Sequence, residues 1–174
     1  MDVLAHGLWT NVIFRRQQRV NRWWAVFFGL APDIFSFGPY ILSQFLLQGG
    51  LPHGRPTPPE YVAVFYNYTH SLVIFFTVFG LAALLRQGRV WWPLAGWGLH
   101  VVIDIGTHTY EFFPTPFLFP VSSWKVSLLS WADPTFMLVN YTFLVLIYTE
   151  WYRQYRKSKF KIQNSKLQFK IQNF

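Results

Sequence analysis

The sequence has no cysteine and few charged residues, and each shortage removes a class of interpretation. Without cysteine the chain offers no disulfide and no thiolate ligand, so any metal must be bound through nitrogen or oxygen. Asp, Glu, Lys and Arg together make up only 13% of the 174 residues, against roughly a quarter in soluble domains. Hydrophobic residues reach 52% and aromatic residues 21%, a balance that predicts lipid as the solvent of the protein.

The net charge of +8 is concentrated at the C-terminal end of the chain. Residues 153–174 hold seven of the fifteen Lys and Arg and no acidic residue, and they repeat the letters FKIQN. A basic segment beside a membrane span is ordinary cytoplasmic flanking sequence, so we expect no nucleic-acid binding. We predict a membrane-embedded domain of residues 1–152 followed by a disordered, cytoplasmic tail of residues 153–174.

Four stretches lack Lys and Arg over lengths that suit a membrane span, which takes about 20 residues. They are Trp23–Leu47, Tyr61–Leu85, Val90–Gly106 and Trp131–Thr149. Residues 1–14 are too few to cross a bilayer, and we expect them to form a half-inserted helix. The predicted fold is therefore an all-α membrane bundle of about four transmembrane helices with a half-inserted N-terminal helix.

Proline and arginine positions refine this topology. Pro32 and Pro39 fall within the first span and predict a kinked or broken helix there. Thirteen of the fifteen basic residues lie on one side of the predicted spans, which by the positive-inside rule is the cytoplasm. We thus expect a multi-pass inner-membrane protein whose C-terminus is cytoplasmic. The outer connectors are Gln48–Pro59, a plain turn region, and the proline-rich Thr107–Ser130, which we expect to lie in the interface or fold back as a lid.

Ionisable side chains inside the predicted membrane region mark the candidate site, because such groups are costly in lipid unless they are paired, hydrated or metal-bound. Counted at about 1.5 Å per residue from the nearest cytoplasmic arginine, they all fall in the middle to outer half of the bilayer. The third span adds two of them at i, i+4 spacing, on one helical face. The candidate metal ligands are His6, Asp33, His70, His100 and Asp104.

Two or three imidazoles with one or two carboxylates form a suitable ligand set for zinc, and also for manganese or iron when more oxygens join. An open coordination position would hold a water, whose lowered pKa would yield a hydroxide nucleophile for hydrolysis. Asp104 serves either as a ligand or as a partner that orients His100, and spacing leaves both roles open. Asp104 and His108 are the candidate catalytic residues, although His108 equally suits a residue that only marks the outer interface.

Two other classes of function use the same residues. A transporter or metal-handling membrane protein could line an ion path with them, and a broken first span would suit that function. A structural membrane subunit could use them only for hydrogen bonds between helices. The site's depth favours a hydrolase that acts on a lipid or other membrane-resident ester or phosphoester.

At these residues the chain resembles the bacterial inner-membrane family of membrane-bound, metal-dependent hydrolases. The matching pieces span about residues 1–150: Leu4-Ala5-His6-Gly7, Gly29-Leu30-Ala31-Pro32-Asp33, Thr69-His70-Ser71-Leu72, and Leu99-His100 followed by Asp104. The resemblance implies that the His and Asp residues of these pieces hold the metal. The chain departs from the family at Phe35, Phe65 and Tyr66, where the family often has Asp, His and Arg. These departures disfavour a two-metal site and leave two outcomes, a divergent single-metal hydrolase or a relative that binds metal without catalysis.

Overall fold

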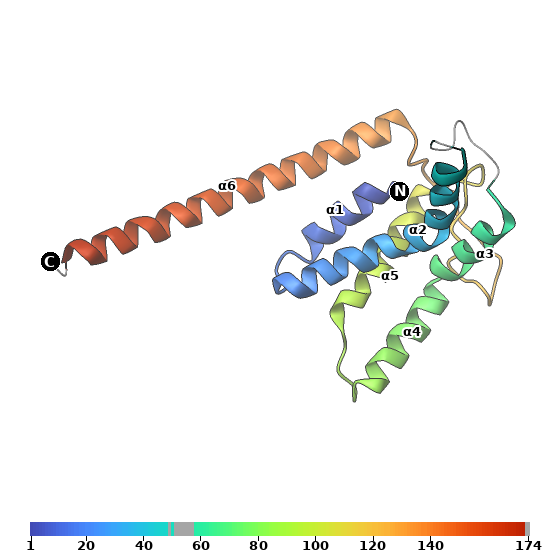
Figure 1. Ribbon diagram of the computed structural model, residues 1–174, viewed down its shortest axis with the longest axis horizontal. Helices are drawn as coiled ribbons and strands as arrows, with labels where there is room; N and C mark the ends of the chain where they lie inside the picture. Colours follow the sequence, from blue (N-terminus) through green and yellow to red (C-terminus); the bar gives the residue numbers. More distant parts are fainter. Residues whose placement is uncertain (49, 51–57, 173–174) are drawn as a thin grey trace. The chain divides into compact units, whose positions relative to one another are not determined.

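The chain is described by a computed structural model that covers residues 1–48, 50 and 58–172 (Figure 1). Helices are the only regular elements in these residues, apart from one isolated bridge between Thr109 and Phe112. The prediction of an all-α fold is confirmed. The predicted connector Gln48–Pro59 lies almost wholly outside the described residues. The helices are α1 (Val3–Ile13), α2 (Arg19–Gln48), α3 (Glu60–Thr69), α4 (Leu72–Leu85), η1 (Trp92–Leu94), α5 (Ala95–Thr107) and α6 (Pro134–Gln172).

Helix α2 is the central element of the first compact unit, Met1–Phe136. It packs against α1, α3, η1 and α5, and α4 packs against α5 (Figure 1). Helix α1 begins at the N-cap Asp2, whose side chain accepts a 3.0 Å hydrogen bond from the amide of Ala5. Its buried face includes His6 and Thr10, so the segment predicted as a half-inserted helix is a short helix with a polar residue turned into the core.

The first predicted span is not broken at its prolines, because α2 continues through both Pro32 and Pro39. Proline removes one backbone hydrogen bond from a helix, and that loss alone does not end a long helix that packing supports. Pro32 is fully buried, and its carbonyl accepts a 2.6 Å hydrogen bond from the hydroxyl of Ser36. The helix therefore delivers Asp33 to the core from its middle rather than from a broken end.

The second predicted span is interrupted instead, at His70. Helices α3 and α4 meet there at a bend of 54°. Ser71 caps α4 by accepting a hydrogen bond from the amide of Ile74, and its own hydroxyl donates to the carbonyl of Phe119. The bend turns the His70 side chain into the interior, where it is fully buried.

The close approach of α5 to α2 depends on Gly96. A Cβ atom at this position would lie 2.2 Å from the carbonyl oxygen of Ala25, closer than any stable contact. Glycine therefore lets the two helix backbones touch near the cytoplasmic end predicted for them. Asp33 lies further along the same α2, and His100 and Asp104 lie further along the same α5.

Among the described residues, one helix is long and apolar enough to cross a membrane, Arg19–Leu47, and the bent pair α3 and α4 qualifies as a second if it forms one span. The third predicted span falls on η1 and the 13-residue α5, which is shorter than the roughly 20 residues a span requires. The fourth predicted span begins in the segment before α6 and continues into that helix. The membrane bundle of four spans remains a prediction.

The second compact unit, Met137–Phe174, consists of helix α6 within the described residues. From the sequence, the helical domain is expected to end at residue 152. The helix continues instead through the basic segment to Gln172. This segment contains no Pro or Gly and many Lys, Arg and Gln residues, which are good helix formers. The structure thus has a helix where the sequence analysis predicts a disordered tail.

Candidate metal centre

The core of the first unit holds five ionisable side chains from four segments. His6 comes from α1, Asp33 from α2, His70 from the bend between α3 and α4, and both His100 and Asp104 from α5. The three imidazoles and Asp104 are 0% exposed, and Asp33 is 7% exposed. Buried charges persist only when they are paired or bound to a metal, so this cluster needs a cation or protons to balance its carboxylates.

Four of these residues direct one atom each toward a common point. The Nε2 atoms of His70 and His100 lie 3.1 Å apart. Asp104 Oδ2 lies 3.2 Å from His100 Nε2 and 3.4 Å from His70 Nε2. Asp33 Oδ1 lies 3.5 Å from His70 Nε2 and 3.8 Å from His100 Nε2. All four atoms lie within 4.8 Å of one another, and we call Asp33, His70, His100 and Asp104 the four-residue group.

The outer nitrogens of both imidazoles in the four-residue group have hydrogen-bond acceptors. His100 Nδ1 donates to the carbonyl oxygen of Gly29 at 2.7 Å. His70 Nδ1 donates to the hydroxyl oxygen of Thr69 at 2.9 Å, since the Thr69 hydroxyl itself donates to the carbonyl of Phe65. Each ring can therefore carry a proton on Nδ1 and present the lone pair of Nε2 to the cluster.

This arrangement has the chemistry and the spacing of a metal site. Two Nε2 lone pairs face each other at 3.1 Å, and beside them Asp104 Oδ2 accepts no hydrogen bond from any described residue. Such a set of electron pairs is repulsive unless a metal ion or a proton lies among them. In a tetrahedral site with bonds of about 2.0–2.1 Å, neighbouring ligand atoms are about 3.3–3.4 Å apart. The distance between the two imidazole nitrogens and the four distances from these nitrogens to the carboxylate oxygens, 3.1–3.8 Å, bracket that value. The four-residue group could therefore bind a divalent metal ion.

His6, the fifth predicted ligand, lies on the other side of Asp104. Its Nε2 is 2.9 Å from Asp104 Oδ1, and its ring stacks on that of His100 with centroids 3.7 Å apart. Burial lowers the pKa of His6 to about 4, so the ring is neutral near pH 7 and donates an Nε2 hydrogen to the carboxylate. The α-amino group of Met1 also donates to Asp104 Oδ1. Asp104 thus uses one oxygen for the four-residue group and the other for hydrogen bonds.

His108 lies at the rim of the same cluster, where α5 ends. Its Nε2 is 3.5 Å from Asp104 Oδ1 and 3.1 Å from the Met1 amino nitrogen. Its Nδ1 is 2.8 Å from the carbonyl oxygen of Phe113 and 2.9 Å from the hydroxyl of Tyr66. Phe113 has φ 45°, a left-handed conformation that costs a non-glycine residue about 1–3 kcal/mol. The hydrogen bond to the carbonyl of Phe113 holds the His108 ring with its Nε2 directed toward Asp104.

Sequence reasoning missed three groups of the site, one of which is the Met1 α-amino group beside Asp104 and His108. Tyr66 was considered only as a departure from the family pattern, yet its hydroxyl donates to the Phe113 carbonyl at 2.8 Å and its ring stacks on His70 at 3.8 Å. Its position four residues before His70 on α3 is a signal that could have found it, because i and i+4 share a helical face. The carbonyl of Gly29 was also missed, and no side-chain pattern could have revealed it.

Comparison of the chain with protein families, curated proteins and solved structures gives no match.

Proposed function

We propose that this chain is a membrane-embedded, metal-dependent hydrolase that acts on a lipid or other membrane-resident ester or phosphoester. The observation that carries the proposal is the pair of Nε2 lone pairs on His70 and His100, facing each other beside two carboxylate oxygens in a buried core. Two histidines that serve only to hold helices together would normally hydrogen-bond to each other, with the N–H of one ring donating to the lone pair of the other. Here both donors are directed outward, which suits a cation at the centre.

Each residue then has a distinct role. Asp33, His70, His100 and Asp104 would hold the ion, which we expect to be zinc. A divalent ion bound there would supply Lewis acidity that activates water and polarises an ester or phosphoester bond. His6 would orient Asp104 by donating a hydrogen bond to the second carboxylate oxygen of Asp104, Oδ1. His108, at the rim, would exchange protons through Nε2, which lies 3.5 Å from Asp104 Oδ1 and 3.1 Å from the Met1 amino nitrogen.

The surface of the first unit supports a membrane location. Large apolar side chains on α2 and α4 are widely exposed, with Leu46 at 69%, Leu84 at 74% and Leu85 at 86%. Soluble monomers rarely leave apolar side chains exposed over a large continuous area. Together with the resemblance to inner-membrane hydrolases, this exposure supports a multi-pass protein of the inner membrane with a cytoplasmic C-terminus and a membrane lipid as partner.

Metal content of the purified full-length chain tests the proposal. We expect stoichiometric zinc or another divalent metal by elemental mass spectrometry, and its loss in Asp33→Asn and His100→Ala. Asp133→Asn is the matched control, because Asp133 is an exposed N-cap whose Oδ1 accepts from the amides of Thr135 and Phe136, and Asn caps equally well. Wild-type protein without metal would refute the proposal.

Turnover separates an enzyme from the other metal-binding functions. We expect hydrolysis of an ester or phosphoester lipid in mixed micelles, its loss after chelation and its recovery when zinc is restored. Asp33→Asn should remain inactive under all three conditions. Metal-bound protein that hydrolyses none of a panel of lipid esters and phosphoesters, but that carries metal across liposome membranes, would favour a transporter.

A further inference from the structure

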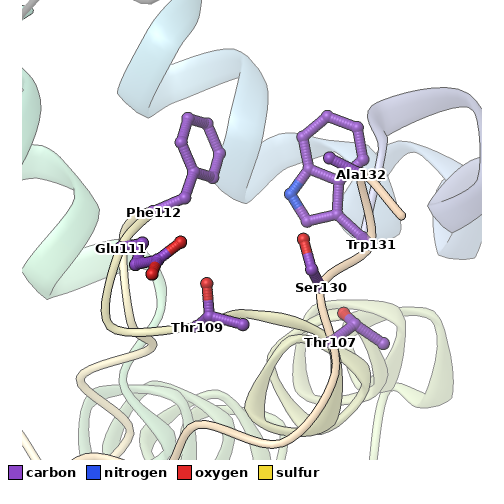
Figure 2. A pocket seen from close by; sticks show the side chains of 7 residues that line it. All are labelled: Thr107, Thr109, Glu111, Phe112, Ser130, Trp131 and Ala132. Atoms are coloured by element: carbon purple, nitrogen blue, oxygen red, sulfur yellow. The ribbon is translucent and has the colours of Figure 1, made fainter. Parts of the chain in front are cut away.

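A cavity of about 250 Å³ lies where the segment after α5 returns to the end of that helix (Figure 2). Its lining includes Thr107, Thr109, Glu111, Phe112, Ser130 and Trp131. Backbone hydrogen bonds fix its walls. The amide of Trp131 donates to the carbonyl of Thr107 at 2.9 Å, and the amide of Phe112 donates to that of Thr109 at 3.0 Å. The cavity is thus part of the folded structure, although it opens to the surface.

One aromatic ring separates this cavity from the candidate metal centre. The ring of Phe112 contacts the ring of His108 with centroids 6.2 Å apart, and it contacts the ring of Trp131 with centroids 5.8 Å apart. His108 Nε2 in turn lies 3.5 Å from Asp104. A molecule that fills the cavity and extends past Phe112 would therefore reach the rim of the metal centre.

The polar atoms of the lining have the character of a cation site. Figure 2 shows the carboxylate of Glu111 and the hydroxyls of Thr109 and Ser130 directed into the same space, between the rings of Phe112 and Trp131. Among the described residues none of these three polar groups has a side-chain hydrogen bond or ion pair. Glu111 carries the only charge in the lining, which contains no Lys or Arg to bind an anion. A carboxylate beside aromatic faces favours an organic ammonium ion.

We propose that this cavity, which we call the outer pocket, binds the ammonium head group of the substrate. The inference rests on the proposed function, and it narrows the substrate to an amphiphile that carries an amine or quaternary ammonium group. Glu111 would supply the opposite charge, Trp131 and Phe112 the aromatic rings beside it, and Thr109 and Ser130 acceptors for N–H groups. The ester or phosphoester next to the head group would then lie toward His108.

Calorimetric titration of the metal-loaded, full-length protein in detergent tests the outer pocket. The probes are non-hydrolysable ether–phosphonate analogues of phosphatidylethanolamine and phosphatidylglycerol with the same short alkyl chains. We expect the ethanolamine lipid to bind at least tenfold more tightly, and we expect Glu111→Gln to abolish that preference. Ethanolammonium chloride should compete with the ethanolamine lipid, which would show that the ammonium group itself is recognised.

Controls separate this proposal from the hydrolase proposal. Glu60→Gln makes the same chemical change at the exposed first turn of α3 and should keep the preference. Glu111→Gln should keep its metal, because Glu111 is not in the four-residue group. Equal binding of the two lipids by wild-type protein, a preference that survives Glu111→Gln, or a failure of ethanolammonium to compete would each overturn the outer pocket. None of these results depends on whether the protein hydrolyses lipid.

Discussion

Replacing Gly96 with alanine should remove metal binding without touching any ligand. The new Cβ atom would lie 2.2 Å from the carbonyl oxygen of Ala25, whereas ordinary contacts begin above 3 Å. Helices α2 and α5 must therefore separate by about 1 Å. Asp33 is on α2, while His100 and Asp104 are on α5. The same shift would therefore increase the distance between Asp33 and the two ligands on α5. Metal sites tolerate only about 0.2 Å of error in ligand distance.

The magnitude of the stability change follows from two opposing effects. Overpacking of a well-packed contact costs about 1–3 kcal/mol, and replacing glycine by alanine inside a helix returns about 1 kcal/mol. We expect Gly96→Ala to be destabilised by up to about 2 kcal/mol on balance, and by more in metal-loaded protein because the ligand energy is also lost. Thermal melts in detergent, with and without chelator, measure both contributions.

Gly106→Ala is the matched control, because it changes the same residue type in the same helix and its Cβ would meet nothing within 4 Å. This variant should gain a few tenths of a kcal/mol to about 1 kcal/mol and keep its metal. If Gly96→Ala retains stoichiometric metal and melts like the wild type, the close helix contact does not position the ligands. The reasoning from helix separation would then be refuted.

Two further variants address the rim and the bend. Tyr66→Phe removes the hydroxyl that contacts His108 Nδ1 and the Phe113 carbonyl, and we expect unchanged metal content with a roughly tenfold loss of turnover, about 1.4 kcal/mol, measured with the lipid substrate. Unaltered turnover would show that this hydroxyl does not position His108. Ser71→Ala removes the N-cap of α4 and should lower stability by about 1–2 kcal/mol in a thermal melt, whereas Ser71→Thr should restore most of it; equal melting of the two variants would contradict the capping role.

The polar residues of the site could be predicted because their spacing and depth are properties of the sequence. His100 and Asp104 stand at i and i+4, and the structure brings Nε2 and Oδ2 within 3.2 Å. Asp33 and His70 come from separate segments, and the requirement that buried charges find partners was enough to group them. Their convergence in one core follows from the same rule.

Other features depend on packing that no local pattern expresses. Pro32 predicts a kink or a break, and α2 continues without a break because its neighbours support it on several sides. The bend at His70 has no proline or glycine to announce it, and it depends on hydrogen bonds from Ser71 and Leu72 to the distant carbonyls of Phe119 and Phe117. At the basic end of the chain, charge and repetition suggest disorder, whereas the residues themselves are good helix formers and α6 continues there.

The hydrogen bond from His100 to the carbonyl of Gly29 has a consequence for how this site can change over evolutionary time. A main-chain oxygen is present whatever residue occupies the position, so the orientation of His100 cannot be lost by altering the chemistry of that side chain. What restricts position 29 is volume, because a Cβ atom there would lie 2.4 Å from the Thr10 hydroxyl. Homologous chains could therefore enlarge residue 29 only where residue 10 has become smaller, and the two positions should vary together.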